Sequence, residues 1–374
     1  MPETRSLELR SLVTPDGQLR LSLESVTLAD PGPDEVLVRV EAAPINPSDL
    51  GLLLGPADLS AMQAGGTPDR PTLTAPIPPQ RMGMMKARLG QSLPVGNEGA
   101  GTVIAAGDNA QALIGKRVGM LGGAMYATHR LLPVRDTIVL PDDASAADGA
   151  SMFVNPLTAL AMVETMRNEG HKAIVHTAAA SNLGQMLNRI AQADGVPLVN
   201  IVRSPEQAGL LRDAGAAHVV DSTADTFRDD LTEAVATTGA TIAFDAIGGG
   251  KLGNAILHAM EAAAGRDAAS YSRYGSTTFK QLYIYGGLDV GPTVLDRGYG
   301  FAWAVSGFLL TPFLIKAGPA KVQAMKDRVA AELKTIFASG YTHTIGLADV
   351  LKPEMVEAYQ RKATGQKYLV DPTR

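Results

Sequence analysis

The alternation of apolar and polar positions is most regular in the middle of the chain, over residues 173–203. Two short apolar, β-branched runs, 173–177 and 196–203, have the length and composition of buried parallel strands. Between them, four apolar side chains recur at helical spacing: Leu183, Leu187, Ile190 and Ala191. Gly195 ends this helix because glycine accepts a positive φ. The stretch therefore predicts a strand–helix–strand unit with a right-handed crossover.

Strands and helices continue to alternate as far as residue 289. The predicted helices cover 204–215, 223–239 and 251–265, and the predicted strands cover 216–221, 240–250 and 281–289. Ser204 is a typical N-cap for the first of these helices, with Pro205 at its first position. Alternation of this regularity predicts a doubly wound parallel sheet, in which ligands bind at the carboxyl ends of the strands.

The N-terminal third of the chain has the short runs and turns of a β-rich domain. Residues 6–44 predict half-exposed strands, and glycines separate further barrel-type strands over 95–133. The pattern then changes, because Asn155-Pro156 predicts a break and residues 157–166 predict a helix. A domain boundary is expected at this change.

Two segments depart from these patterns. Residues 57–93 lack clear periodicity and are rich in Pro, Met and Gly, so they are either functional or a mobile surface insertion. The methionines suit an adaptable cover over an apolar substrate, which makes a lid or pocket wall the functional hypothesis. The most apolar run, 301–315, is too short to span a bilayer and contains Pro312, so it predicts a buried helix or an interface segment.

Composition narrows the range of functions. A length of 374 residues with 45% apolar residues predicts two domains with sizeable cores. The 33 basic and 38 acidic residues give a net charge of −5 without a basic block, which argues against nucleic acid and membrane as partners. The absence of cysteine excludes disulfides, thiolate catalysis and Cys-ligated zinc. The first residues lack the apolar core of a signal peptide, so a cytoplasmic location is expected.

The turn between the first predicted strand and its helix is where chemistry enters. Residues 178–181 are small, and Gly184 follows three positions after Ser181. Small side chains give a phosphate access to the N–H groups of a helix N-terminus, and Gly184 lets the helix pack closely on its strand. Because Ala and Ser replace two glycines of the G-x-G-x-x-G pattern, the turn by itself fits an ordinary crossover equally well. Small-residue turns at 245–248 and 286–287 fall at the same sheet edge and favour a cofactor site.

The second strand of the central unit predicts which cofactor binds. It ends in Val202-Arg203-Ser204, without the carboxylate that NAD enzymes use to bind the ribose 2′-OH. A guanidinium at this position can pair with a 2′-phosphate, so Arg203 predicts NADPH. The alternative for Arg203 is an ordinary surface arginine.

Seven motifs occur in a specific order along the chain. They are INPSD (45–49), GNEGAGTVIAAG (96–107), VNPLTAL (154–160), the 178–184 turn, FDAIGGG (244–250), YIYGGL (283–288) and ATGQKYLVDP (363–372). Together they resemble the zinc-free branch of the medium-chain dehydrogenases/reductases, which contains quinone oxidoreductases and 2-enoyl thioester reductases. The resemblance covers nearly the whole chain apart from 57–93 and 264–278. It implies an α/β architecture, with a GroES-like β-barrel catalytic domain (1–148 and 341–374) and an inserted doubly wound Rossmann domain (149–340) that binds the dinucleotide.

The resemblance also implies site residues. Asn46 would be a catalytic residue near the nicotinamide, and Lys367 matches a basic tail residue that returns to the cleft. The other implied cofactor-binding residues are Thr158, Ser181, Asn182, Leu183, Gly184, Asp245, Ile247, Gly248, Tyr285, Gly286, Gly287 and Leu288. Gly286 and Gly287 would allow the flat nicotinamide ring to approach the backbone. Family members usually dimerise through the cofactor domain, which together with the apolar 301–315 run predicts a homodimer.

Two departures from the family bear on mechanism. Enoyl reductases carry a tyrosine proton donor eleven residues after the Asn of NPSD, and here that position is Ala57. Protonation then falls to water or to another group. The candidate tyrosines are Tyr126, Tyr274, Tyr299 and Tyr341, and Tyr126 is our catalytic candidate. The cysteine positions of the zinc-dependent members are empty and no histidine pair has metal-ligand spacing, so no metal is expected. His176, inside a strand, is expected to be a packed or hydrogen-bonded histidine.

The sequence thus predicts a zinc-independent, NADPH-dependent oxidoreductase that delivers hydride to a small conjugated carbonyl, a quinone or an enone. Two alternatives stay open. A 2-enoyl-thioester (enoyl-CoA or enoyl-ACP) reductase is weakened by Ala57, although Arg81, Lys86 and Arg88 in the 57–93 segment suit a long acyl or pantetheine chain. A pyridine-nucleotide-binding protein without turnover is also allowed, because no acid/base constellation is evident.

Overall fold

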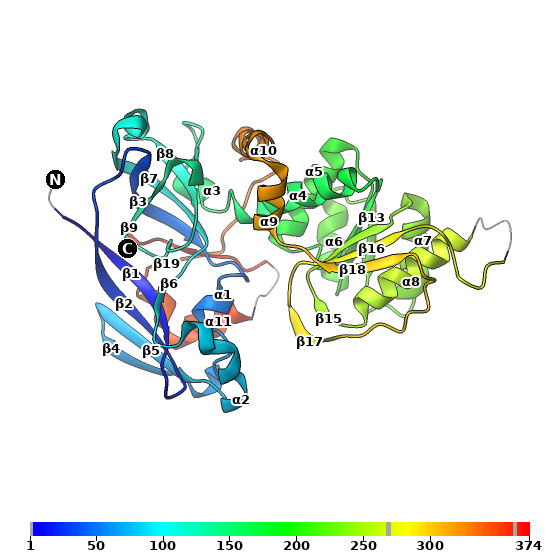
Figure 1. Ribbon diagram of the computed structural model, residues 1–374, viewed down its shortest axis with the longest axis horizontal. Helices are drawn as coiled ribbons and strands as arrows, with labels where there is room; N and C mark the ends of the chain where they lie inside the picture. Colours follow the sequence, from blue (N-terminus) through cyan, green and yellow to red (C-terminus); the bar gives the residue numbers. More distant parts are fainter. Residues whose placement is uncertain (1–2, 267–270, 362–364) are drawn as a thin grey trace. The chain divides into compact units, whose positions relative to one another are not determined.

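The computed structural model describes residues 3–266, 271–361 and 365–374 (Figure 1). The chain divides into two compact units: unit 1, Met1–Val154 with Lys326–Arg374, and unit 2, Asn155–Met325. The boundaries expected from the sequence were 148/149 and 340/341. Residues 326–340 group with unit 1, where Lys334 pairs with Asp143 at 2.7 Å. Residues 267–270 of the 264–278 segment and 363–364 of the C-terminal motif lie outside the described residues.

Unit 2 is built on a six-stranded sheet in the order β13-β12-β11-β14-β16-β18. These strands are β11 (Ile174–His176), β12 (Leu198–Val202), β13 (His218–Asp221), β14 (Ile242–Asp245), β16 (Lys280–Ile284) and β18 (Trp303–Gly307). All neighbours pair in parallel. Counted along the chain the order is 3-2-1-4-5-6, which is that of the dinucleotide-binding fold. The predicted doubly wound parallel sheet is confirmed.

Helices connect the strands and bury their apolar faces. They are α4 (Val154–Asn168), α5 (Asn182–Asp194), α6 (Pro205–Asp213), α7 (Phe227–Thr238), α8 (Leu252–Gly265), α9 (Leu310–Ala317) and α10 (Pro319–Ala331). Leu231 of α7 and Leu257 of α8 share a core with strand residues such as Val199. Gly195 ends α5 in the left-handed conformation, as predicted. The predicted break at Asn155-Pro156 is wrong, because α4 contains both residues.

Pro156 is tolerated in α4 because it lies in the first turn, where a backbone N–H has no acceptor inside the helix. Two short strands, β15 (Gly248–Gly250) and β17 (Asp289–Thr293), pair beside the main sheet of unit 2. None of the described helices combines the length and the apolarity that a membrane crossing requires.

Unit 1 consists of two sheets. The first has the order β4-β5-β2-β1-β6 and the second the order β10-β8-β7-β3-β20-β19, with β9 also paired to β3. The strands are β1 (Thr4–Val13), β2 (Gln18–Leu28), β3 (Glu35–Pro44), β4 (Gln63–Thr67), β5 (Arg70–Pro76), β6 (Ser92–Pro94), β7 (Glu98–Ala106), β8 (Arg117–Leu121), β9 (His129–Pro133), β10 (Thr137–Val139), β19 (His343–Ile345) and β20 (Tyr368–Val370). Because β20 pairs with β3, the last residues of the chain complete a sheet begun near its start.

Short helices fill the connections of unit 1. They are α1 (Leu50–Leu53), η1 (Leu59–Ala61), α2 (Pro79–Met82), η2 (Gly83–Arg88), η3 (Asp108–Leu113), η4 (Val134–Asp136), α3 (Ala146–Gly149), η5 (Asp349–Leu351) and α11 (Pro353–Gln360). The 57–93 segment is therefore largely regular structure. Its strand β5 pairs with β2, and Leu73, Ala75 and Ile77 are buried in the core. A mobile insertion is the wrong description of this segment, because it supplies part of a sheet.

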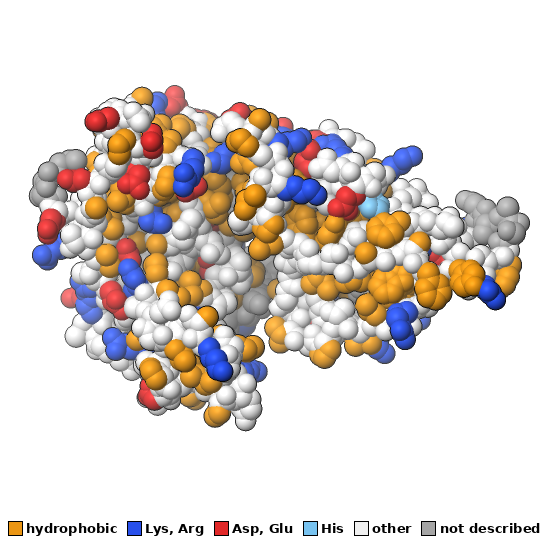
Figure 2. Space-filling view, viewed as in Figure 1, with side chains coloured by type: hydrophobic (Ala, Val, Ile, Leu, Met, Phe, Trp, Pro, Cys, Tyr) orange, Lys and Arg blue, Asp and Glu red, His pale blue; other side chains and the backbone are white. Residues whose placement is uncertain are grey.

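The apolar 301–315 run is not the buried helix that we considered. It forms the edge strand β18 and most of α9, and none of the residues of α9 is buried. Phe301, Leu309 and Ile315 are 82%, 67% and 78% exposed. Figure 2 shows hydrophobic side chains gathered along this edge of unit 2. The segment places apolar surface on the outside of the unit.

Candidate active site

The turn between β11 and α5 has the geometry of a phosphate-binding turn. Ala178 has a φ of 50°, in the left-handed region that favours glycine. Ser181 is the N-cap of α5, and its Oγ accepts the N–H of Gly184 at 3.2 Å. A Cβ on Gly184 would lie 2.2 Å from the carbonyl oxygen of Ala179. Only glycine therefore lets the helix begin this close to the turn.

The N-terminus of α5 can accept an anionic group. Among the described residues, no acceptor takes the backbone N–H of Leu183, as is usual for the first turn of a helix. The flanking side chains are small, since Ala179 and Ala180 are alanines and Ser181 turns its oxygen back to cap the helix. A phosphate would meet N–H groups and the positive end of the helix dipole here. The residues present fit a dinucleotide pyrophosphate.

The turn after β14 is shaped by a buried acid. Asp245 is 1% exposed and accepts hydrogen bonds from Thr177 Oγ1 at 2.7 Å, Ile247 N at 2.9 Å and Gly248 N at 3.2 Å. Thr177 also accepts the N–H of Ala246 at 2.8 Å. These hydrogen bonds connect the turn after β14 to the turn after β11. Asp245 therefore stabilises both turns at the carboxyl edge of the sheet. No pattern in the sequence marks Thr177 for this role, because it lies at the end of an apolar strand.

The two glycines of the turn after β16 have different surroundings, although both were predicted to lie against the nicotinamide. A Cβ on Gly286 would lie 2.6 Å from the carbonyl oxygen of Ala246, so the neighbouring turn already requires this glycine. At Gly287 a Cβ would meet nothing within 4 Å, and the residue is exposed. Leu288 beside it is 43% exposed. The backbone at Gly287 is thus the part of this turn that is open to a flat ring.

The side chain of Tyr285 points to the sheet and not outward. Its hydroxyl is hydrogen-bonded to His176 Nε2 at 2.8 Å, and the two rings stack at 5.7 Å. His176 has no exposed surface, and burial lowers its pKa to about 3, so it is neutral at physiological pH. His176 is the packed, hydrogen-bonded histidine that we expected. Burial raises the pKa of Tyr285 above its ordinary value, which keeps the hydroxyl protonated.

Arg203 follows β12 at the same edge of the sheet. Its side chain is exposed, and no described carboxylate forms an ion pair with it. Its backbone N–H donates to Gln207 Oε1 at 3.1 Å, which fixes the start of the following loop. Because β12 pairs directly with β11, the guanidinium and the 178–184 turn belong to neighbouring strand ends. Thr158 is on α4 and is 8% exposed.

Unit 1 contains a separate buried polar cluster. Asn46 follows β3, Glu98 begins β7 and Lys367 precedes β20, and these three strands are adjacent in the sheet. Antiparallel pairing brings the end of β3 and the starts of its two neighbours to one edge. The Asn46 amide Nδ2 donates to Glu98 Oε1 at 2.7 Å. The sheet thereby brings two predicted residues, Asn46 and Lys367, to one place from opposite ends of the chain.

Two buried acids hold the cluster in shape. Glu98 Oε2 accepts the N–H groups of Phe153 at 3.0 Å and Val154 at 2.8 Å. Asp49 accepts the N–H groups of Asn46 and Asn97, each at 2.8 Å. Burial raises the pKa of Asp49 to about 7 and also raises the pKa of Glu98, because desolvation outweighs these hydrogen bonds. Neither acid was predicted as a site residue, although Asp49 lies in the motif 45–49 and Glu98 in the motif 96–107.

Lys367 completes the cluster. Its Nζ donates to Ser151 Oγ at 2.7 Å, and Ser151 Oγ is hydrogen-bonded to the Tyr341 hydroxyl at 2.8 Å. The ammonium lies 5.1 Å from the centre of the Tyr341 ring. Burial lowers the pKa of Lys367 to about 8, while the charges of Glu98 and Asp49 act in the opposite direction. A cation with this pKa can both stabilise negative charge and release a proton near neutral pH.

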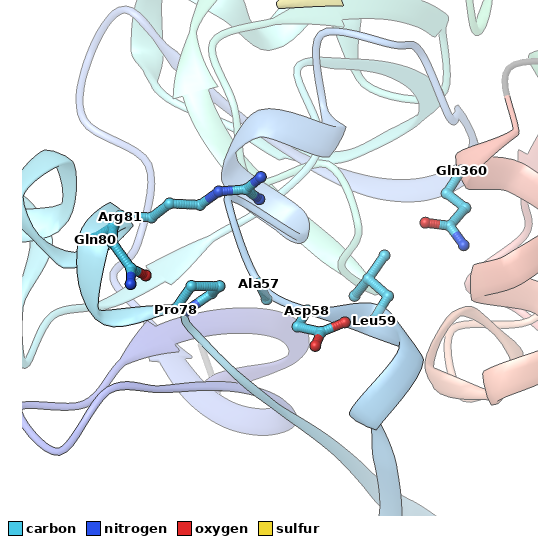
Figure 3. Close-up of a pocket in the computed structure, with 7 residues that line it drawn as sticks. All are labelled: Ala57, Asp58, Leu59, Pro78, Gln80, Arg81 and Gln360. Carbon is cyan, nitrogen blue, oxygen red and sulfur yellow. The ribbon is translucent and has the colours of Figure 1, made fainter.

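Unit 1 also has a pocket of about 460 Å³ (Figure 3). It is lined by Ala57, Asp58, Leu59, Pro78, Gln80, Arg81 and Gln360. Most of these residues come from the 57–93 segment, and Gln360 ends α11 on the other side. One of the lining residues is Ala57. At this position the resemblance implies a tyrosine in enoyl reductases.

Comparison with known proteins agrees with this architecture. Residues 32–142 match the alcohol dehydrogenase GroES-like domain. A crystal structure of a protein assigned as an NADPH:quinone reductase from Mesorhizobium loti superposes with a TM-score of 0.73 and 27% identity over 100% of both chains. The fold is that of the medium-chain dehydrogenases/reductases.

Other similar proteins include enoyl reductases. The mitochondrial enoyl-[acyl-carrier-protein] reductase of Xenopus tropicalis is 29% identical over 213 residues, which are 54% of this chain and 51% of the relative. The chain thus spans about half the length of the curated relatives that it matches. A mutant enoyl thioester reductase from Candida tropicalis has a TM-score of 0.69, 20% identity and coverage of 98% of this chain and 100% of its own, a likeness of fold alone.

Within this medium-chain dehydrogenase/reductase fold, the candidate tyrosines lie in different places. Tyr126 has no exposed surface, and its hydroxyl donates to the carbonyl oxygen of Pro44 at 3.0 Å. Burial raises the pKa of Tyr126 well above its ordinary value. This position favours a structural tyrosine over a proton donor. Tyr274 and Tyr299 belong to unit 2, whereas Tyr341 joins the Lys367 cluster of unit 1.

The described part of the chain contains no group of three or more His, Asp or Glu side chains arranged to hold a metal ion. His258 and Asp296 form a pair at 2.6 Å. A pair of ligands at the surface is fewer than zinc takes in proteins.

Proposed function

We propose that this protein is a zinc-independent oxidoreductase that uses NADPH to reduce a conjugated carbonyl compound, a quinone or an enone. The observation that carries the proposal is the carboxyl edge of the unit 2 sheet. There the 178–184 turn, the exposed guanidinium of Arg203 and the open backbone at Gly287 follow neighbouring parts of one parallel sheet. Phosphate, 2′-phosphate and ring recognition at such an edge together describe NADPH.

In this proposal, residues of unit 2 would bind the cofactor and residues of unit 1 would bind the acceptor. Ser181 to Gly184 would hold the pyrophosphate, Arg203 the 2′-phosphate, and the backbone beside Gly287 the nicotinamide. The bound cofactor would supply the hydride. In unit 1, Glu98 fixes the Asn46 amide through its Nδ2, and no described donor occupies the Asn46 amide oxygen. Asn46 and the Lys367 ammonium would orient the acceptor and stabilise the negative charge that hydride addition creates.

Names of similar proteins support this proposal. The Mesorhizobium loti protein is assigned as an NADPH:quinone reductase, and a quinone oxidoreductase of Escherichia coli was crystallised with NADPH. Acceptor-dependent oxidation of NADPH by the purified protein tests it, with quinones, enones and enoyl thioesters as acceptors. We expect turnover with at least one class, unchanged after chelation. NADPH binding without oxidation by any acceptor would leave a binding protein, and activity lost on chelation and restored by zinc would refute zinc independence.

A second candidate is a 2-enoyl-thioester reductase, and the unit 1 pocket favours it. Arg81, Gln80 and Gln360 offer hydrogen-bond donors to the amide and phosphate groups of an acyl carrier arm, in a space of about 460 Å³ (Figure 3). In this proposal, residues 57–93 form the pocket wall that selects the acceptor. An Arg81→Ala variant should then lose kcat/KM for enoyl thioesters about tenfold and keep it for a small quinone. Equal losses for both acceptors would separate the pocket from acceptor choice.

We also propose a homodimer in which unit 2 supplies the interface. Strand β18 is the edge of the parallel sheet, and an unpaired edge is a template for pairing with a second copy. Leu309 and Ile315 place apolar side chains beside it. An isologous contact of this kind is the commonest route to a closed dimer.

A further inference from the structure

The ammonium group of Lys367 has donor capacity that the described residues do not use. An ammonium carries three N–H groups. One donates to Ser151 Oγ at 2.7 Å, and the face of the Tyr341 ring lies 5.1 Å from the nitrogen. Within the described chain, no second acceptor is bonded to this nitrogen. A half-buried lysine with free N–H groups can donate to a bound molecule.

The proposed reduction of a conjugated carbonyl compound needs such a donor. Hydride addition to a conjugated carbonyl leaves negative charge on oxygen, which a proton must neutralise. Ala57 stands where the resemblance implies a tyrosine donor, and the Tyr126 hydroxyl is bonded to Pro44. In each of the two acids, Asp49 and Glu98, both carboxyl oxygens accept hydrogen bonds from the protein. Of these groups, only Lys367 holds acidic protons that are not already bonded inside the cluster.

We propose that the Lys367 ammonium is the proton donor of this reaction and that Ser151 and Tyr341 position it. The inference rests on the proposed function. The bound cofactor would supply a hydride. On an enone, a C–H bond forms at the β-carbon and an electron pair moves to the carbonyl oxygen. On a quinone, an O–H bond forms at one oxygen and an electron pair moves to the other oxygen. An Nζ–H bond of Lys367 then breaks, its proton forms a bond to the enolate or hydroquinone anion, and the electron pair stays on nitrogen. The neutral amine recovers a proton from water.

Charged and titratable groups surround Lys367 from several elements. Glu98 on β7 and Asp49 before α1 favour the charged ammonium, and burial opposes it. The Tyr341 hydroxyl faces it through Ser151 and itself lies in the field of Asp148 on α3. The balance leaves the pKa of Lys367 at about 8, close to the pH at which a general acid works best. Because the protonated form is the active one, activity should fall as pH rises through this value.

The test compares Lys367→Met with Lys352→Met, a control at an exposed lysine paired with Asp349. We expect Lys367→Met to lose kcat by about 100-fold or more, with the Kd of NADPH unchanged within about threefold by fluorescence titration. The log of kcat/KM of the wild type should fall by about one per pH unit above its limb. Lys352→Met should behave as the wild type. A Lys367→Met variant that keeps kcat, or that loses NADPH binding in proportion to its activity, overturns the assignment.

A second measurement needs no cofactor. NMR titration of carbon-13-labelled lysine in the cofactor-free protein reads the pKa of Lys367 directly, which we expect at about 8. Ser151→Ala should lower this pKa by about one unit, because it removes a hydrogen bond to the charged form, and should move the kinetic limb equally. A kinetic limb that stays in place while the NMR pKa moves would contradict the role. A wild type without acceptor-dependent NADPH oxidation removes the reaction itself, whereas an active Lys367→Met variant removes only this donor.

Discussion

The chemistry of single residues in this protein is set by partners that are distant in sequence. Asn46 is oriented by Glu98, and Lys367 by Ser151 and Tyr341. The family resemblance singled out Asn46 and Lys367, and the structure places both in the buried cluster around Glu98, while their roles stay predictions. The resemblance did not predict that Tyr126 is fully buried, because burial depends on how the sheets of unit 1 pack. The same limit hid Ser151, which has no neighbours in sequence that mark it as functional.

A single substitution tests the proposed contact between Arg203 and the 2′-phosphate of NADPH. Arg203→Ala should raise the Kd of NADPH by about 10- to 100-fold and leave the Kd of NADH nearly unchanged, because it removes charge-assisted hydrogen bonds to a 2′-phosphate. Fluorescence titration of both nucleotides measures this. Arg212→Ala, at an exposed arginine near the end of α6, is the matched control and should change neither value. Equal affinity of the wild type for both nucleotides would contradict the assignment.

At the scale of elements, the turn–helix junction at the start of α5 depends on one glycine. Gly184→Ala should destabilise the protein by about 1–3 kcal/mol and weaken NADPH binding, because its Cβ would overlap the Ala179 carbonyl at 2.2 Å. Urea unfolding measures the stability change. The control is Gly209→Ala in α6, where a Cβ would meet nothing within 4 Å. This variant should stabilise the protein by about 0.5–1 kcal/mol, because alanine favours a helix over the unfolded chain. Equal stability of the two variants would mean that α5 can shift away from the turn.

Elements with strong local signals were the ones that the sequence predicted. The strands and helices from β11 to β16 follow from β-branched runs and helical spacing, which are properties of neighbouring residues. The 57–93 segment was not predicted as regular structure, because the pairing of its strand β5 with β2 is long-range. The 301–315 run was misjudged as a buried-helix candidate because apolar composition alone does not tell a strand at a sheet edge from a core helix.

The exposed apolar edge of unit 2 is the surface that we propose as the interface of a homodimer. A double variant, Leu309→Asp with Ile315→Asp, should convert a dimeric wild type into a monomer, because two like charges would be buried in the contact. Light scattering at micromolar concentration measures the mass. Met84→Asp, at a methionine of unit 1 that is 66% exposed, should leave the dimer intact. A monomeric wild type would show that these side chains face solvent.

We propose above all that this protein transfers hydride from NADPH to an acceptor. The most direct measurement supplies NADPH deuterated at C4 of the nicotinamide together with an acceptor that supports turnover, preferably an enone, and determines the deuterium in the product by mass spectrometry. We predict one deuterium at the β-carbon of the product and a solvent-derived proton at the α-carbon. Hydride transfer from NADPH would be contradicted by a product that carries no deuterium from either C4 position of the cofactor. It would also be contradicted if NADPH bound and no product formed.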